Sequence, residues 1–272
     1  MRKPAKTKGP AGQTGNEMMI QASCHKASSA SLALVAASMA LIALSGAAQA
    51  QNTGFYVRGD LGVAFSTQAN TQDDNCGGGA PFFGCGTALD SSAGTSLAFT
   101  IGGGYHFTPW FRGDATIGYR PLFGVDGTIV RPGSANRPFE ADVSSVAGMV
   151  NGYLDIAGLV QGGTGILQPY VMAGIGFAHN DIGDVASTHP TTNAAQTSPG
   201  GGNIAFAWTL GVGTGVDVGK GFVLDFGYKY LDLGDFKSDA GNACAGGTCR
   251  YVDSVTGGLT VHEFSAGVRY NF

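Results

Sequence analysis

Charged side chains are scarce in this 272-residue chain, since Asp, Glu, Lys and Arg together make up 12% of it. Its 15 basic residues stand against 19 acidic ones, which argues against the basic patch that nucleic-acid-binding proteins need. The apolar run LALVAASMALIAL at 32–44 has 13 residues, whereas a membrane-spanning helix needs about 20. Helical periodicity is missing from the rest of the chain. These absences exclude nucleic acid as a partner and argue against a helical membrane anchor.

Motifs for phosphate or metal binding are missing as well. The segment IGGGYHF at 101–107 has consecutive glycines, but it lacks the GxGxxG spacing leading into a helix that cradles phosphates. No CxxC pair is present to suggest a zinc site. The 46 glycines instead suit curved strands with little room beside them.

The first fifty residues contain the three parts of a secretory signal peptide. Basic residues precede the apolar run at 32–44, and small residues follow it up to Ala48 and Ala50. We therefore expect residues 1–50 to be a signal peptide that is cleaved after Ala50. The translation start is open among three methionines: Met1, Met18 and Met19. The remaining chain, 51–272, has 10 basic and 18 acidic residues, which gives a net charge of −8.

Four cysteines follow the leader: Cys76, Cys85, Cys244 and Cys249. An exported chain meets an oxidising compartment, where such cysteines form disulfides. Four cysteines allow three pairings. Zinc binding is the alternative, but no histidine lies near either pair. We expect the local pairs Cys76–Cys85 and Cys244–Cys249, because local pairing closes the shorter loops.

Alternation of large apolar with small or polar residues runs through the chain after the leader. In 203–217, for example, Ile204, Phe206 and Trp208 alternate with small residues, as in a strand whose successive side chains point to opposite faces. Eight segments show this pattern: 54–65, 96–107, 110–120, 143–156, 169–178, 203–217, 222–230 and 261–272. We predict eight antiparallel strands.

The connections between these segments alternate in length. Long polar stretches, which we expect to be surface loops, lie at about 66–95, 121–142, 179–202 and 231–258, and shorter turns join the other strands. Long loops at one end and short turns at the other are typical of bacterial outer-membrane barrels. The predicted fold is therefore all-β, an eight-stranded antiparallel transmembrane up-and-down β-barrel over residues 51–272.

The composition of the small-and-polar face indicates whether that face points into the lumen or out to water. A soluble, lipocalin-like barrel would bury its large apolar residues and carry many charges outside. Here the polar face is mostly Gly, Ala, Ser and Thr, which suits a crowded interior. Its charges are of both signs, so a balanced network can form there. We predict a luminal charge network of ten residues: Arg58, Asp60, Arg112, Asp114, Arg120, Asp155, Asp225, Lys229, Glu263 and Arg269.

The segments LDFGYKYLDLGD at 224–235 and VHEFSAGVRYNF at 261–272 carry a family resemblance. With GFYVRGDLG at 54–62 and MVNGYLDI at 149–156, the chain resembles the small outer-membrane β-barrel surface antigens. These include opacity proteins and the OmpA transmembrane domain, and the likeness is greatest to abundant alphaproteobacterial members.

The resemblance implies a surface protein of the cell outer membrane. It also implies that Tyr270 and Phe272 form the aromatic-x-Phe signal that the barrel-assembly machinery recognises. We expect no peptidoglycan-binding domain after the barrel, so that activity of OmpA-type proteins is not transferred.

We expect a non-enzymatic structural protein or surface antigen with an adhesion role. Its expected partners are outer-membrane lipid, the assembly machinery and a host or envelope surface ligand. Catalytic residues are not expected, because His262 and Glu263 point to opposite faces of their strand. We also expect neither a metal nor a cofactor. Two alternatives stay open: narrow, porin-like passage of small solutes, and haem binding by the loops through His179 or His189.

Overall fold

The computed structural model describes residues 53–68, 71–73, 89–129, 137–159, 166–188, 195–245, 248–252 and 254–272. The predicted leader at 1–50 lies outside these residues, as do Cys76, Cys85 and His189.

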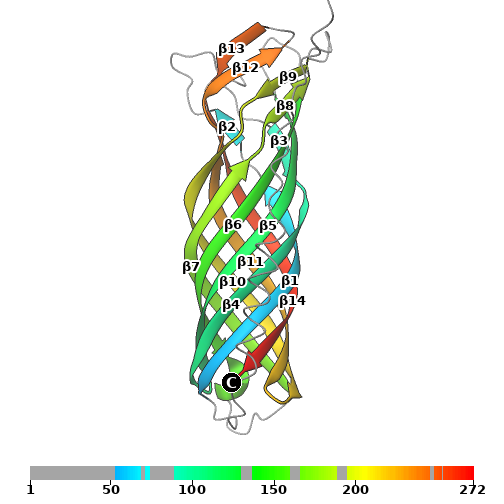
Figure 1. Cartoon of the computed structure of the whole chain (residues 1–272). Coiled ribbons are helices and arrows are strands. Elements are labelled where there is room, and N and C mark those ends of the chain that lie inside the picture. The colour runs from blue at the N-terminus through cyan, green and yellow to red at the C-terminus, as the bar shows by residue number, and fades with distance from the viewer. Residues whose placement is uncertain are drawn as a thin grey trace, which may run out of the picture. The chain divides into compact units, whose positions relative to one another are not determined.

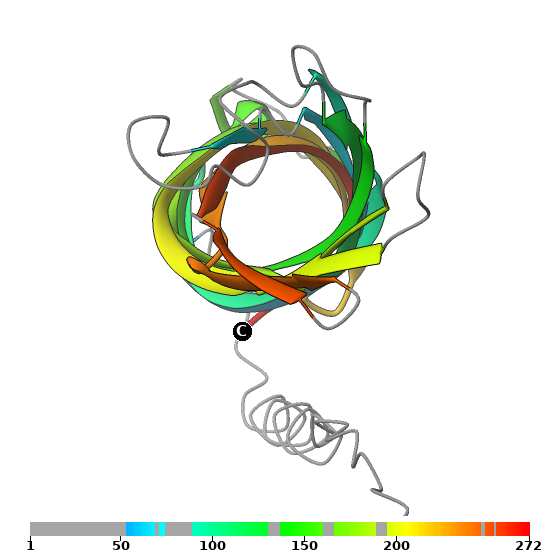
Figure 2. The ribbon, with the colours of Figure 1, turned by 90° about the horizontal axis from the view of Figure 1, so that it is seen from above.

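Eight long antiparallel strands form a closed ring (Figures 1 and 2). They are β1 (Gly54–Gln68), β4 (Thr95–Thr108), β5 (Phe111–Ile129), β6 (Arg137–Asp155), β7 (Leu167–Ile182), β10 (Gly201–Gly219), β11 (Phe222–Lys237) and β14 (Val255–Asn271). Each pairs with the next, and β14 pairs with both β11 and β1, which closes the ring. The predicted eight-stranded antiparallel up-and-down barrel is therefore confirmed.

The register of the strands shows how steeply they are staggered. A row of paired residues that starts at Val261 on β14 passes through Leu231, Thr209, Gly174, Asn151, Asp114, Gly104 and Tyr56. It returns to β14 at Asn271, ten residues from its start. Closing a sheet with such a shear requires the strands to tilt against the barrel axis, so each row descends obliquely around the wall.

The described outer wall is apolar. Large exposed side chains cover it on every ring strand, among them Leu61, Ile101, Val150, Ile175 and Phe206. A water-soluble barrel would bury such side chains, whereas hydrocarbon solvates them. The strand parity predicted to face lipid is therefore the outer one.

Helical structure is minor in the described part. The segment α2 (Ile156–Leu159) is a single turn after β6. No helix of the described residues is long and apolar enough to cross a membrane.

Several ring strands run well past the predicted loop boundaries. β5 continues to Ile129, and β11 continues to Lys237, where loops were expected from 121 and 231. Each extension follows an irregularity in register, between Arg120 and Phe123 on β5 and between Asp232 and Asp235 on β11. A bulge adds one residue and reverses which parity points inward.

Short strands extend the sheet beyond the ring at the end of the long connections (Figure 1). They are β2 (Thr71–Asp73), β3 (Leu89–Ala93), β8 (Val185–Thr188), β9 (Ala195–Ser198), β12 (Gly241–Ala245) and β13 (Thr248–Val252). β8 pairs with β6 and with β9, and β9 pairs with β12. The β8–β9 and β12–β13 hairpins thus form one continuous sheet with β6.

Glycines in the wall make room for inward-pointing tyrosines. A Cβ on Gly104 would lie 2.5 Å from Cζ of Tyr56, and one on Gly213 would lie 2.5 Å from Cζ of Tyr170. The tyrosine rings therefore lie directly against bare backbone. At the β10–β11 turn, glycine is needed for its backbone conformation. Gly219, Lys220 and Gly221 all have positive φ, a conformation that glycine adopts readily.

Candidate functional site: the lumen and the extracellular surface

The lumen near the short turns holds two ion pairs and three tyrosines. Nε of Arg112 lies 3.1 Å from Oδ2 of Asp155, and Nε of Arg269 lies 3.3 Å from Oδ2 of Asp225. The Arg112 guanidinium also lies over aromatic faces, 4.2 Å from the ring centroid of Tyr153. Tyr170 and Tyr56 lie on the same cation at 4.8 and 5.7 Å. Cation–π contact stabilises a buried cation beyond what its carboxylate partner provides.

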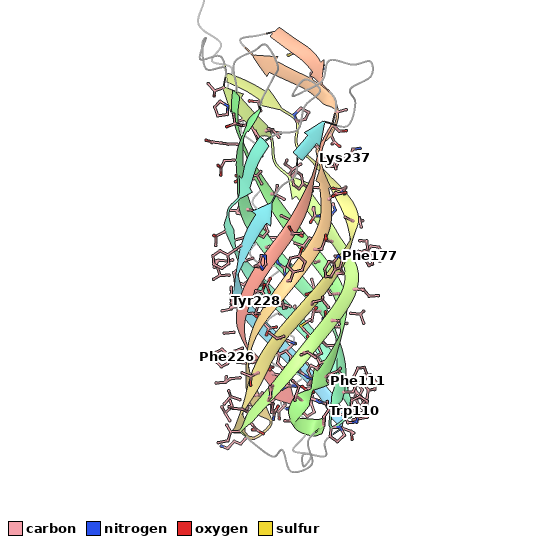
Figure 3. All side chains as sticks on the ribbon, turned by 180° about the vertical axis from the view of Figure 1, so that it is seen from behind. Trp110, Phe111, Phe177, Phe226, Tyr228 and Lys237 are labelled. Carbon is pink, nitrogen blue, oxygen red and sulfur yellow. The ribbon has the colours of Figure 1, made fainter. Side chains whose placement is uncertain are left out.

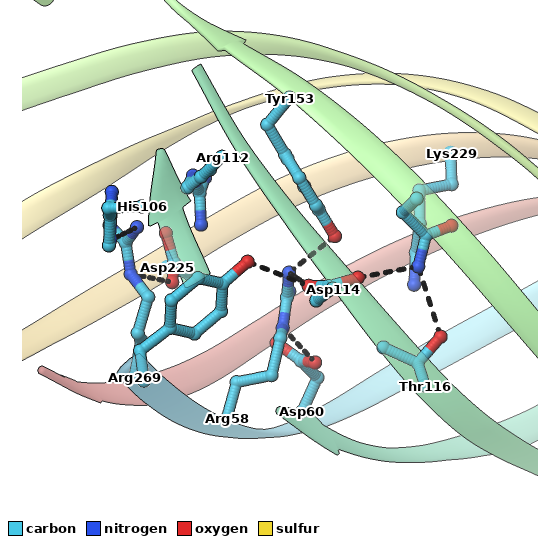
Figure 4. Close-up of polar contacts among 12 residues, drawn as sticks. Arg58, Asp60, His106, Arg112, Asp114, Thr116, Tyr153, Asp225, Lys229 and Arg269 are labelled. Atoms are coloured by element: carbon cyan, nitrogen blue, oxygen red, sulfur yellow. Dashed lines mark hydrogen bonds and ion pairs between the residues drawn. The ribbon is translucent and has the colours of Figure 1, made fainter. Parts of the chain in front are cut away.

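Arg58 is the centre of a second group of polar contacts in the lumen, several of which are drawn in Figure 4. Its guanidinium binds both oxygens of Asp60, at 2.9 and 2.8 Å, and donates to the Tyr153 hydroxyl at 2.7 Å. Asp114 lies 3.4 Å from the same guanidinium. The Asn151 amide donates to Asp114 at 2.7 Å and to Thr116 at 3.1 Å. This layer is satisfied by side chains from β1, β5 and β6.

Glu263 is the centre of the third group. Its Oε2 lies 2.6 Å from Nη2 of Arg120, and its Oε1 lies 2.7 Å from Nζ of Lys229. A cavity of about 30 Å³ lies between this group and the Arg58 layer, which is room for one or two water molecules. Arg120 lines this cavity, and its buried Nη1 has no hydrogen-bond partner among the described residues.

Above these groups the interior becomes apolar. Buried side chains from most ring strands meet there to form what we call the apolar layer: Phe123, Val125, Phe139, Val143, Ile182, Leu231, Leu233, Phe236, Leu259 and Val261. Several, such as Phe123 and Leu233, have no solvent exposure. The polar lumen is therefore closed by packed hydrocarbon toward the long-loop end.

Aromatic residues line the outside at the short-turn end, along the consecutive ring strands β11, β14, β1, β4 and β5. Rings of neighbouring strands touch there, with centroids 4.8 Å apart for Phe55–Tyr105 and 4.8 Å for Phe222–Tyr270. Figure 3 shows Trp110 and Phe111 at this end of the barrel. We call this set the lower aromatic belt: Phe55, Tyr105, Phe107, Trp110, Phe111, Phe222, Tyr270 and Phe272.

A second set of aromatic residues lies higher on the outer wall and is called the upper aromatic belt: Phe65, Phe177, Phe206, Trp208, Tyr228, Tyr230, His262 and Phe264. Tyr270 and His262 mark the two belts on β14, eight residues apart. At about 3.4 Å per residue and a tilt near 40°, the belts are ~20 Å apart. That spacing fits the apolar band of an outer-membrane barrel.

The net charge of residues 51–272 resides at the long-loop end. The four predicted loop ranges hold twelve acidic and four basic residues, a net charge of −8, while the ten luminal residues are five of each sign. Exposed acids of the extended strands include Glu140, Asp142, Asp181 and Asp235. The extracellular surface is therefore acidic and the lumen is neutral.

Nine of the ten side chains predicted to line the lumen belong to buried residues, and Lys229 keeps 12% side-chain exposure. The structure joins the ten into the three groups above.

His179 is exposed and lies 3.2 Å from Asp181. Cys249 is disulfide-bonded, and Cys244 lies opposite it in the β12–β13 hairpin. We keep Cys244–Cys249 as our proposal for the pairing.

Prediction from sequence missed the tyrosines as partners of the charges, and it missed the apolar layer. The signal for the tyrosines was present, because Tyr56 and Tyr153 share the parity of the luminal charges on their strands, and Tyr170 lies on the small-residue parity of 169–178. The signal for the apolar layer was hidden on β5, because the bulge after Arg120 shifts the alternation by one residue.

Comparison with known proteins identifies a family. The family model described as "Outer membrane protein beta-barrel domain" matches residues 33–272. A protein of Rickettsia felis named "Putative adhesin" is 26% identical over 254 residues, covering 88% of this chain and 98% of the relative. The outer membrane protein PagN of Salmonella typhimurium is 29% identical over 124 residues, covering 46% of this chain and 48% of PagN.

Among solved structures, the outer membrane protein OprG of Pseudomonas aeruginosa aligns with a TM-score of 0.48 at 12% identity. The alignment covers 80% of this chain and 97% of OprG.

Proposed function

The chain belongs to the outer membrane protein β-barrel family, and from that premise we propose that it is a non-enzymatic surface adhesin. The barrel anchors the protein in the cell outer membrane, and the strands that extend beyond it present the binding surface. The observation that carries the proposal is the sheet formed by the β8–β9 and β12–β13 hairpins on top of β6. Pairing holds these short strands in a defined arrangement, which favours recognition because less entropy is lost on binding.

Charge points to the kind of partner. Exposed acids such as Glu140, Asp142 and Asp235 stand on the extended strands, and the loop ranges carry a net charge of −8. A cationic patch on a host or envelope surface is complementary to this surface, and such complementarity speeds encounter and suppresses wrong partners. Binding should weaken as salt is raised, because the screening length is only ~10 Å at 0.1 M.

Curated relatives support the adhesive role. The Rickettsia felis relative is named as an adhesin, and the match spans almost its full length. The lumen supports a non-enzymatic role, since its charged side chains are engaged with one another in ion pairs such as Arg58–Asp60 and Lys229–Glu263.

The proposal is tested by removing the β12–β13 hairpin. Residues 241–252 are replaced by a short Gly-Ser turn, and the variant is displayed on a non-adherent bacterial strain. We expect loss of attachment to host cells, while the protein stays in the outer-membrane fraction and keeps its altered gel mobility before boiling. A matched control carries Lys220→Asn in the short turn at the opposite end. Attachment equal to that of the unaltered protein would overturn the proposed role of the hairpins.

A further inference from the structure

A groove of about 640 Å³ runs across the outer wall between the two aromatic belts. Its lining comes from five consecutive ring strands, β5, β6, β7, β10 and β11, and is almost entirely apolar. The side chains along one edge are Phe111, Leu154, Val171, Val212 and Tyr228, which are register partners of one another from strand to strand. The groove therefore follows a row of paired residues.

The next row explains the depth of the groove. Its members in register are Gly113, Gly152, Ala173, Leu210 and Tyr230. Gly152, which has no side chain, and Ala173, which has only a methyl group, lie between larger neighbours on either side: Leu154 and Val171 in one row, and Val150 and Ile175 in the other. A trough between ridges results, because side chains of one row stand roughly perpendicular to the sheet.

Each end of the groove has a distinct character. Its lower end lies at Phe111 of the lower aromatic belt, beside the β4–β5 turn. Its upper end is bounded by Tyr228 and Tyr230, and the Tyr228 hydroxyl lies 2.6 Å from Nδ1 of His262. This hydrogen bond pairs two polar groups that hydrocarbon would otherwise leave without a partner. The groove therefore extends from the short-turn end of the wall, which faces the periplasmic leaflet, up to the aromatic side chains of Tyr228 and Tyr230.

We propose that the groove binds one acyl chain of a glycerophospholipid from the periplasmic leaflet of the outer membrane. The groove is continuous with the lipid-facing wall, so its occupant comes from the bilayer. Its volume falls within the range of ~300–1,000 Å³ typical of sites for single small ligands. Across five strands spaced ~4.8 Å apart it is about 19 Å long, which suits one extended hydrocarbon chain. A second copy of this convex barrel would bridge the trough without filling it.

Placing a larger side chain on the floor of the trough tests the proposal. Ala173 and Ala266 both belong to outward-facing, exposed positions of the wall, and Ala266 is outside the groove. Ala173→Leu fills the trough, while Ala266→Leu adds the same atoms to the wall elsewhere. Folded protein is extracted from outer membranes in mild detergent and examined by native mass spectrometry. We expect one phospholipid on the unaltered protein and on A266L, with about tenfold lower occupancy on A173L, equivalent to ~1.4 kcal/mol of binding.

A second measurement works in the bilayer itself. Trp208 stacks on Tyr230 with 5.4 Å between ring centroids, and the chain has only two tryptophans. In a Trp110→Phe background, phospholipids brominated in the acyl chain should quench Trp208 more strongly in the parent than after Ala173→Leu. Three results would overturn the proposal: absence of bound lipid on the unaltered protein, equal retention and quenching by A173L, or a bound mass of lipid A or of a second barrel.

Discussion

Arg120 on β5 and Glu263 on β14 meet inside the barrel, with 2.6 Å between Nη2 and Oε2. The two strands are not neighbours in the ring, so this contact crosses the lumen. Lys229 binds the other oxygen of the same carboxylate at 2.7 Å. The two oxygens of one buried carboxylate thus pair with two cations, one on the neighbouring strand β11 and one across the lumen on β5.

Removing the charge of Glu263 should destabilise the barrel strongly. Glu263→Gln leaves Arg120 and Lys229 without their carboxylate, and breaking a buried ion pair in this way costs about 3–5 kcal/mol. We expect a lower midpoint of urea unfolding for protein refolded in lipid vesicles. Glu140→Gln, at an exposed position, is the control and should shift the midpoint little. Equal shifts in the two variants would contradict the luminal network.

Close packing of tyrosine on glycine gives a second prediction. A Cβ on Gly213 would lie 2.5 Å from the Phe226 carbonyl oxygen and from the Tyr170 ring, so Gly213→Ala should cost about 1–3 kcal/mol. Gly148 has nothing within 4 Å of such a Cβ. Gly148→Ala should therefore be neutral or slightly stabilising, since it reduces the entropy of the unfolded chain. The stability of both variants is measured as the temperature at which their gel mobility changes. Similar losses of stability in the two variants would refute the packing account.

The apolar layer predicts opposite behaviour of two neighbours on β5. Phe123 is fully buried, whereas Leu122 is 58% exposed on the outer wall. Phe123→Ala opens a cavity and should cost about 3–5 kcal/mol, while Leu122→Ala should cost far less. Urea unfolding of both variants tests whether the inward-pointing parity reverses at the bulge. A larger loss of stability for L122A than for F123A would show that the parity is assigned backwards.

A sealed lumen predicts the absence of ion conduction. Packed side chains such as Phe123, Leu233 and Val261 close the interior above the charged groups, and an eight-stranded barrel is only wide enough for side chains to fill it. Purified protein in planar bilayers should give a flat current trace. Reproducible stepwise currents would instead support the porin-like alternative and show a continuous water path.

The sequence was sufficient to predict the barrel because period-2 alternation is strong where one face meets lipid. Residues such as Ile204, Phe206 and Trp208 alternate with small residues over a whole strand, and the luminal charges share one parity. The extents of β5 and β11 were not predictable in the same way. The alternation restarts with the opposite parity near Pro121 and Gly234, so a simple count ends the strand there.

Contacts across the lumen lay beyond the reach of sequence for another reason. The pairing of Arg120 with Glu263, or of Arg58 with Tyr153, depends on shear and side-chain length, which no local pattern encodes. The groove is similar, because Gly113, Gly152 and Ala173 become neighbours only through the register of three strands.

The adhesive role of the acidic extracellular surface is tested most directly by neutralising that surface without altering the barrel. The variant E140Q/D142N/D235N and the control D217N, changed at the exposed short-turn end, are purified, held in lipid nanodiscs and titrated onto host cells. We predict that the triple variant binds weakly and loses the salt dependence of the parent, while D217N binds like the parent. Unchanged binding by the folded triple variant would contradict the account.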